Sequence, residues 1–182
     1  MQIVESAELF VIEKHAGVKK GNGVFYLDHL KGVVTRLKNL GITDQEVLAA
    51  AWLHDIMYDA KATFDEIDKI FGSRVSVLVL ALFKDSSLPK SQIEKQYVRQ
   101  LSESSLEAKM IKLCDISTCL KELKNTPWSK TRRTKQVKKE LYYLNIIKHE
   151  LSKAKNQYLG IQNIVNGINE VITSHGQRPI AL

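Results

Sequence analysis

Apolar side chains recur at every third or fourth position through almost the whole chain. This spacing places them on one face of an α-helix. The sequence has no alternation of apolar and polar residues between hairpin turns, which is the pattern of strands. Only three prolines and nine glycines occur among the 182 residues, so helices can be long. The pattern therefore predicts an all-α fold.

Local signals divide this pattern into helices. The runs Thr43–Glu46 and Thr63–Glu66 both have the form of a capping box, a hydroxyl followed three residues later by Glu, which opens a helix. Gly41 and Gly72 stop two of the helices. We expect helices at about residues 1–18, 26–39, 43–54, 63–72, 73–83, 92–101 and 105–123, a long one after residue 129 and a last one around 161–172.

The sequence predicts one domain over residues 1–182, because it contains no repeat, low-complexity stretch or linker. The last predicted helix has an apolar stripe, which must be covered. Either the core of the same chain or a second subunit could cover it, and the second case would make a homodimer. The stripe consists of Ile161, Ile164, Val165, Ile168, Val171 and Ile172.

Three features argue against a membrane protein and a secreted disulfide scaffold. The longest apolar run, Val75–Phe83, is far shorter than the roughly 20 residues that cross a bilayer. The N-terminus lacks the basic segment and apolar core of a secretory signal. Two cysteines, Cys114 and Cys119, are too few for a disulfide framework. We therefore expect a cytoplasmic protein without a membrane partner.

The net charge of +7 is concentrated in one part of the chain. Eleven Lys or Arg residues and only three Glu residues lie between Lys121 and Lys155. A basic face indicates an anionic partner, either a phosphate substrate or a nucleic acid. The alternative is a solvated helix surface. We do not expect nucleic acid as the partner, because no nucleic-acid motif accompanies the charge.

Four residues suggest a metal site. His54 and Asp55 are adjacent at the end of a predicted helix, and His29 lies on the helix before it. Asp115 lies among apolar residues of a later helix, where an unpaired carboxylate would be costly. Imidazole nitrogen and carboxylate oxygen both suit a borderline divalent cation.

The order of these four residues resembles the H…HD…D signature of the HD phosphohydrolase superfamily. The surrounding sequence is similar to one branch, the hydrolase domain of the RelA/SpoT stringent-response proteins and the small alarmone hydrolases. The similar stretches are Gly23–His29, Ile42–Asp55, Ala62–Val75, Leu88–Lys90 and Ala108–Asp115. They cover roughly residues 8–150, which we take as the core, with residues 151–182 as a helical C-terminal extension.

The resemblance implies a fold, a cofactor and a reaction. The fold would be the HD-type bundle of about eight to ten helices. The metal, held by His29, His54, Asp55 and Asp115, would be manganese. The substrate would be a phosphorylated nucleotide, and the activity that of a guanosine 3′,5′-bis(diphosphate) 3′-pyrophosphohydrolase of the stringent response.

The chain departs from the family at two functional positions. The family follows its His-Asp pair with two residues and then a Glu-Asp pair, and here these positions hold Tyr58 and Asp59. Asp59 keeps one catalytic acid, whereas the phenol of Tyr58 cannot replace a carboxylate as the base. Cys119 stands where the family has a substrate-binding Asn, and a thiol is a weak donor and acceptor.

Other residues are candidates for contacts with substrate phosphates. These are Lys20, in a basic stretch before the first metal ligand, Lys90, and Arg132 in a Trp-Ser-x-x-Arg stretch. For each of them a solvated surface position is the alternative.

Three functions stay open at this point. The leading hypothesis is a metal-dependent hydrolase of ppGpp-like nucleotides. Alternatives are an HD domain that binds or senses a nucleotide without turnover, suggested by Tyr58 and Cys119, and an HD phosphatase with another nucleotide substrate.

Overall fold

A computed structural model describes residues 2–15, 17–59 and 62–182. In this part of the chain the regular elements are all helices, and the β-type pairing is limited to an isolated bridge between Lys19 and Phe25. The all-α prediction is therefore confirmed. The helices are α1 (Ile3–His15), α2 (Tyr26–Asn39), α3 (Gln45–Leu53), α4 (Ile56–Asp59), α5 (Phe64–Phe71), α6 (Ser73–Leu82), α7 (Lys90–Glu103), α8 (Leu106–Glu122), α9 (Lys130–Ala154) and α10 (Gly160–Ser174), with a 3-10 turn, η1 (Leu123–Asn125), after α8.

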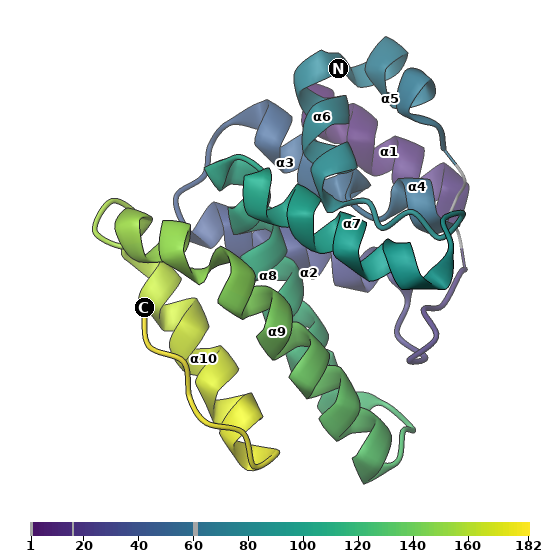
Figure 1. Cartoon of the computed structure of the whole chain (residues 1–182). Helices are drawn as coiled ribbons and strands as arrows, with labels where there is room; N and C mark the ends of the chain where they lie inside the picture. The colour runs from purple at the N-terminus through teal and green to yellow at the C-terminus, as the bar shows by residue number, and fades with distance from the viewer. Residues whose placement is uncertain (1, 16, 60–61) are drawn as a thin grey trace.

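Helix α8 forms the centre of the bundle. It contacts α2, α3, α6, α9 and α10, while α1 packs on α3 and α7 bridges α6 and α9 (Figure 1). Eleven consecutive residues of α8, Ala108–Thr118, are buried, although two are lysines and one is an aspartate. A helix that is covered on all sides is a rigid support, and Asp115 lies in its middle.

Helix α3 begins one residue later than a capping box at Thr43 would require. The N-cap is Asp44, whose Oδ1 accepts hydrogen bonds from the amides of Glu46 at 3.0 Å and Val47 at 3.2 Å. The same carboxylate pairs with Arg74 of α6 at 2.8 Å. The second predicted cap is confirmed, since Thr63 Oγ1 accepts from the Glu66 amide at 3.1 Å.

Helix α1 ends at His15 rather than near Val18, because the chain turns there into a short loop. Backbone amides hold this loop closed: that of Tyr26 donates to Val18 at 3.0 Å, and that of Lys20 donates to Val24 at 2.8 Å. The loop therefore fixes Lys20 beside the start of α2. Helix α7 begins at Lys90, directly after Pro89, two residues before the predicted start.

The apolar stripe of α10 is covered by the chain itself. Ile161, Val165, Ile168 and Ile172 are buried, and α10 packs against α8 and α9. Figure 1 shows α10 (yellow) lying beside these two helices. A homodimer stays a prediction, and it would need another surface. No helix in the described ranges has both the length and the apolar character that crossing a bilayer requires.

Candidate active site

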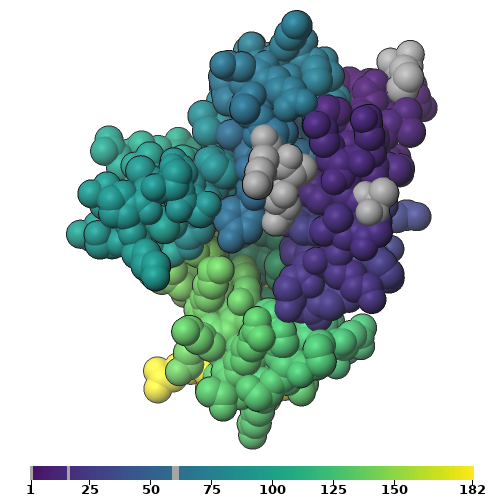
Figure 2. Space-filling model, turned by 90° about the vertical axis from the view of Figure 1, so that its right-hand side faces the viewer, coloured from purple at the N-terminus to yellow at the C-terminus, as the bar shows by residue number. Residues whose placement is uncertain are grey.

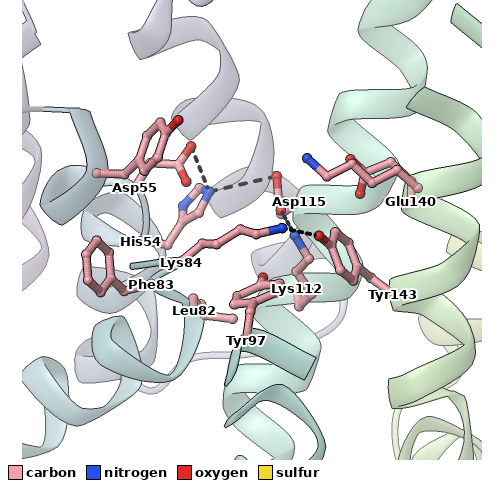
Figure 3. A pocket seen from close by; sticks show the side chains of 12 residues that line it. His54, Asp55, Leu82, Phe83, Lys84, Tyr97, Lys112, Asp115, Glu140 and Tyr143 are labelled. Carbon is pink, nitrogen blue, oxygen red and sulfur yellow. Dashed lines mark hydrogen bonds and ion pairs between the residues drawn. The ribbon is translucent and has the colours of Figure 1, made fainter. Parts of the chain in front are cut away.

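Three helices bring the four predicted metal ligands together. His29 comes from α2, His54 and Asp55 from the end of α3, and Asp115 from α8. His29 Nε2 lies 3.2 Å from Asp115 Oδ1, and His54 Nε2 lies 3.8 Å from the same oxygen. His54 Nε2 is also 3.5 Å from Asp55 Oδ2. Figure 3 shows the His54 ring directed between the two carboxylates. The sequence pattern thus corresponds to one compact cluster.

The other nitrogen of each imidazole is already engaged. His29 Nδ1 donates to Glu122 Oε1 at 2.8 Å, and His54 Nδ1 donates to the carbonyl oxygen of Ala51 at 2.8 Å. A proton held on Nδ1 leaves the lone pair of the neutral ring on Nε2. Both Nε2 lone pairs therefore point at the carboxylates.

Neither Nε2 atom has a hydrogen-bond partner among the described residues, although both rings are buried. Lone pairs and carboxylate oxygens that face one another repel unless a positive charge lies between them. A proton is one solution, and Asp115 and Glu122 do raise the His29 pKa against the opposing effects of burial and Lys20. A divalent cation is the other, and the donor atoms of His29, His54 and Asp55 lie within 4.8 Å of one another. The residues present fit such an ion.

Positive charges keep the two aspartates ionised. Burial would raise the pKa of Asp55, but His54 and Lys20 hold it at about 2. Burial would likewise raise the pKa of Asp115, which Lys112 and His29 hold well below its ordinary value. Both side chains are therefore anionic near neutral pH, as carboxylate ligands of a cation must be.

Two residues that support the ligands were not predicted. Glu122 orients His29 and also accepts a 3.2 Å hydrogen bond from Asn22 Nδ2. Lys112, buried in α8, donates to Asp115 Oδ2 at 2.7 Å. A helical count could have found both, because Glu122 follows Asp115 by two turns and Lys112 precedes it by one.

Two cavities lie beside the cluster and share part of their lining. One has a volume of about 230 Å³ and the other about 420 Å³. Figure 2 shows the face on which the purple N-terminal segment, teal α7 and green α9 converge. Both cavities are lined by Asp55, Tyr58, Asp115, Lys139 and Glu140. A ligand in either cavity would reach the carboxylates of Asp55 and Asp115 without crossing the core.

The larger cavity contains three of the predicted substrate residues. Lys20 bridges to Asp55 at 3.4 Å, Cys119 Sγ donates to Asp115 Oδ1 at 3.3 Å, and the Arg132 guanidinium stacks over Trp128 at 4.1 Å. Lys90 is exposed at the start of α7 and lines neither cavity.

The two predicted catalytic residues lie on the short helix α4. Tyr58 is 58% exposed and lines both cavities at their shared mouth. Asp59 ends α4, one turn after Asp55, and its side chain lies outside the part of the chain that the structure describes.

The smaller cavity has a polar lining that the sequence did not indicate. Lys84 donates to the Tyr143 hydroxyl at 2.8 Å and pairs with Glu94. Tyr97 meets Tyr143 edge to face at 5.2 Å. Glu140 is 3% exposed, and burial raises its pKa. These residues come from the segment after α6, from α7 and from α9, so only the tertiary fold unites them.

Comparison with known proteins identifies relatives. Residues 7–144 match the family model of the HD domain. The guanosine-3′,5′-bis(diphosphate) 3′-pyrophosphohydrolase MESH1 of Danio rerio is 40% identical over 129 residues, 68% of this chain and 72% of that protein. The protein of the same name from Mus musculus is 38% identical over 137 residues, 72% of this chain and 76% of that protein.

A solved structure has the same architecture. It is described as a metazoan ortholog of SpoT that hydrolyzes ppGpp and plays a role in starvation responses, and it superposes with a TM-score of 0.79 at 25% identity, covering 97% of each chain. The chain therefore belongs to the HD-domain family, in the branch of the MESH1 proteins and this SpoT ortholog.

Proposed function

We propose that this protein is a metal-dependent phosphohydrolase that removes pyrophosphate from the 3′ position of guanosine 3′,5′-bis(diphosphate). The observation that carries the proposal is the pair of buried Nε2 atoms of His29 and His54, which have no hydrogen-bond partner in the described part of the chain and face the carboxylates of Asp55 and Asp115. The relatives named for this reaction supply the substrate class.

His29, His54, Asp55 and Asp115 would hold the metal, which we propose to be Mn²⁺. The carboxylates of Asp55 and Asp115 supply the oxygen donors that manganese prefers. The chemistry that a divalent ion supplies in such a site is Lewis acidity, which lowers the pKa of water and offsets charge on phosphoryl oxygens.

The chain's own cations would bind the diphosphate groups. Lys20, Arg132 and Lys139 line the larger cavity beside the proposed metal site. Each would offset part of the substrate's negative charge. Trp128 holds the Arg132 guanidinium by stacking, so less side-chain entropy is lost when Arg132 meets a phosphate. We assign Lys90 to a peripheral contact at most, since it lies outside both cavities.

Proton transfer is assigned to the helix that follows the metal ligands. We propose Asp59 as the base that takes a proton from the attacking water, with Tyr58 at the adjacent family Glu position contributing only a hydroxyl. The larger cavity also holds Cys119, which we propose lies next to the substrate.

We treat residues 1–182 as one domain, because the α10 stripe is buried against α8. Cys114 and Cys119 are free thiols, which agrees with the proposed place in the reducing cytoplasm.

A substrate panel tests the proposal. Purified protein loaded with Mn²⁺ is incubated with guanosine 3′,5′-bis(diphosphate), GTP and GDP, and released pyrophosphate is measured together with bound metal. We expect pyrophosphate and GDP from the first substrate alone. His54→Ala should abolish turnover, whereas His149→Ala, at an exposed position of α9, is the matched control.

Tyr58 and Cys119 favour a second candidate, a domain that binds the nucleotide without hydrolysing it. Metal-loaded protein that binds guanosine 3′,5′-bis(diphosphate) without releasing pyrophosphate would support this candidate and exclude the first. Release from a different nucleotide in the panel would instead indicate an HD phosphatase of other specificity.

A further inference from the structure

We propose that Cys119 is an additional, soft ligand of the metal site, so that this protein holds thiophilic divalent ions such as Zn²⁺ more tightly than its two histidines and two aspartates alone would. The inference rests on the metal site of the proposed function. It concerns a residue of this chain that differs from the Asn of similar sequences.

The position of the sulphur carries the proposal. The donor atoms of His29, Asp115 and Cys119 lie within 4.8 Å of one another. Asp115 Oδ1 is 3.3 Å from Cys119 Sγ and 3.2 Å from His29 Nε2. In a tetrahedral site, donors at about 2.0–2.3 Å from one zinc ion lie roughly 3.3 to 3.8 Å apart, so these two separations are close to those of ligands that share an ion.

A second observation is independent of the cysteine. His29 is fully buried, yet its Nε2 has no hydrogen-bond partner among the described residues. Its Nδ1 is held by Glu122, so the ring cannot turn to satisfy Nε2 elsewhere without breaking that bond. His29 Nε2 is thus a fixed electron-pair donor. It points at Asp115 Oδ1, the oxygen that the Cys119 thiol also contacts.

Cys119 lines the larger cavity together with Lys20, so its sulphur is accessible to an ion that enters from that side. Without an ion, burial and the Asp115 carboxylate raise the pKa of the Cys119 thiol well above its ordinary value. On binding, the thiol proton, now shared with Asp115, would pass to solvent and the sulphur lone pair would go to the ion. Cys114 offers no such route, because it is fully buried on another face of α8 in the core.

Thiolate ligands select zinc, cadmium and cobalt, whereas manganese prefers oxygen. The consequence is a difference in selectivity. Removing the sulphur should weaken zinc binding while leaving manganese binding nearly unchanged. In the wild-type protein zinc should displace manganese readily.

The test combines X-ray absorption with competition titrations on the full chain. Zinc-loaded wild-type protein should show one sulphur neighbour at about 2.3 Å. Cys119→Ser should lose this sulphur neighbour, and its affinity for zinc should fall at least about tenfold. A loss of that size is already seen when a residue that only hydrogen-bonds to a metal ligand is removed. Cys114→Ala is the control and should keep the sulphur signal, with circular dichroism verifying its fold.

Pyrophosphate release by the manganese form of the same preparation separates the two proposals. Zinc bound by nitrogen and oxygen alone, or equal losses of zinc and manganese affinity in Cys119→Ser, overturns the role of Cys119 and leaves the proposed function standing. A sulphur ligand without turnover supports Cys119 and counts against the hydrolase. Failure to bind any divalent ion overturns both.

Discussion

His29 Nδ1 lies 2.8 Å from Glu122 Oε1, two turns of α8 beyond Asp115. The carboxylate fixes the proton on Nδ1 and turns Nε2 toward the proposed ion. Asn22 holds the second oxygen of Glu122 at 3.2 Å. The orientation of His29 thus depends on Glu122, which is not itself one of the proposed metal ligands.

Glu122→Ala should lower the affinity for Mn²⁺ by about 10–100-fold, the usual loss for such a partner. Asn22→Ala is the control, since it removes the neighbour of Glu122 and keeps the bond to His29. Competition with a metal-sensitive dye measures both variants. Equal affinities for Glu122→Ala and the wild type would contradict the orienting role.

Lys112→Met should destabilise the metal-free protein by up to about 3–5 kcal/mol, because it removes the closest cation, at 2.7 Å, from the buried Asp115 carboxylate and leaves only partial compensation by His29. Urea unfolding measures the change. Lys109→Met is the matched control: Lys109 is also buried in α8 but makes no ion pair in the described part of the chain. Similar losses in both variants would show that packing, rather than charge, is responsible.

The fold could be predicted because helical periodicity is a local property. The bounds of α2, Tyr26–Asn39, agree with the predicted ones. The choice of Asp44 over Thr43 as the cap of α3 could not be predicted, because both side chains suit an N-cap and Arg74, which pairs with Asp44, comes from another helix.

The clustering of His29, His54, Asp55 and Asp115 could be predicted from their pattern, whereas the environment of the cluster could not. Lys84 and Tyr143 are 59 residues apart in sequence. They meet because α7 packs against both α6 and α9. Buried charges such as Glu140 look like surface residues in a basic, solvated helix until the neighbouring helices are placed. Pairings of this kind depend on tertiary contacts, which no local pattern encodes.

Acid should weaken the metal-free fold through Asp55. Its pKa is lowered from 3.8 to about 2 in the folded protein. A lowered folded-state pKa contributes stability above the ordinary value, and this contribution is lost as the pH falls from about 4 toward 2. Unfolding free energies over this range should therefore fall more steeply for the wild type than for Asp55→Asn. Asp28→Asn, at an exposed position of α2, should follow the wild type.

Helix α10 should contribute to stability as part of the same core. Ile168→Ala should cost about 2–5 kcal/mol, since the side chain is 1% exposed against α8. Leu159→Ala, at a position 77% exposed before α10, should change stability by no more than about 0.5 kcal/mol. Urea unfolding of both variants checks the difference. A small change in the unfolding free energy of Ile168→Ala would indicate that α10 is not part of the cooperatively folded core.

Tyr58→Glu should raise the turnover of guanosine 3′,5′-bis(diphosphate). The side chain lines both cavities at their mouth, three residues after Asp55, so a carboxylate there could accept a proton that the phenol cannot. A positioned acid or base supplies about 10²–10⁴-fold, which sets the upper range of the gain in kcat. Tyr58→Gln is the neutral control of similar size to Glu. If the Glu and Gln variants have the same kcat, the absence of a carboxylate at position 58 does not limit turnover. Proton transfer would then be assigned to Asp59 alone.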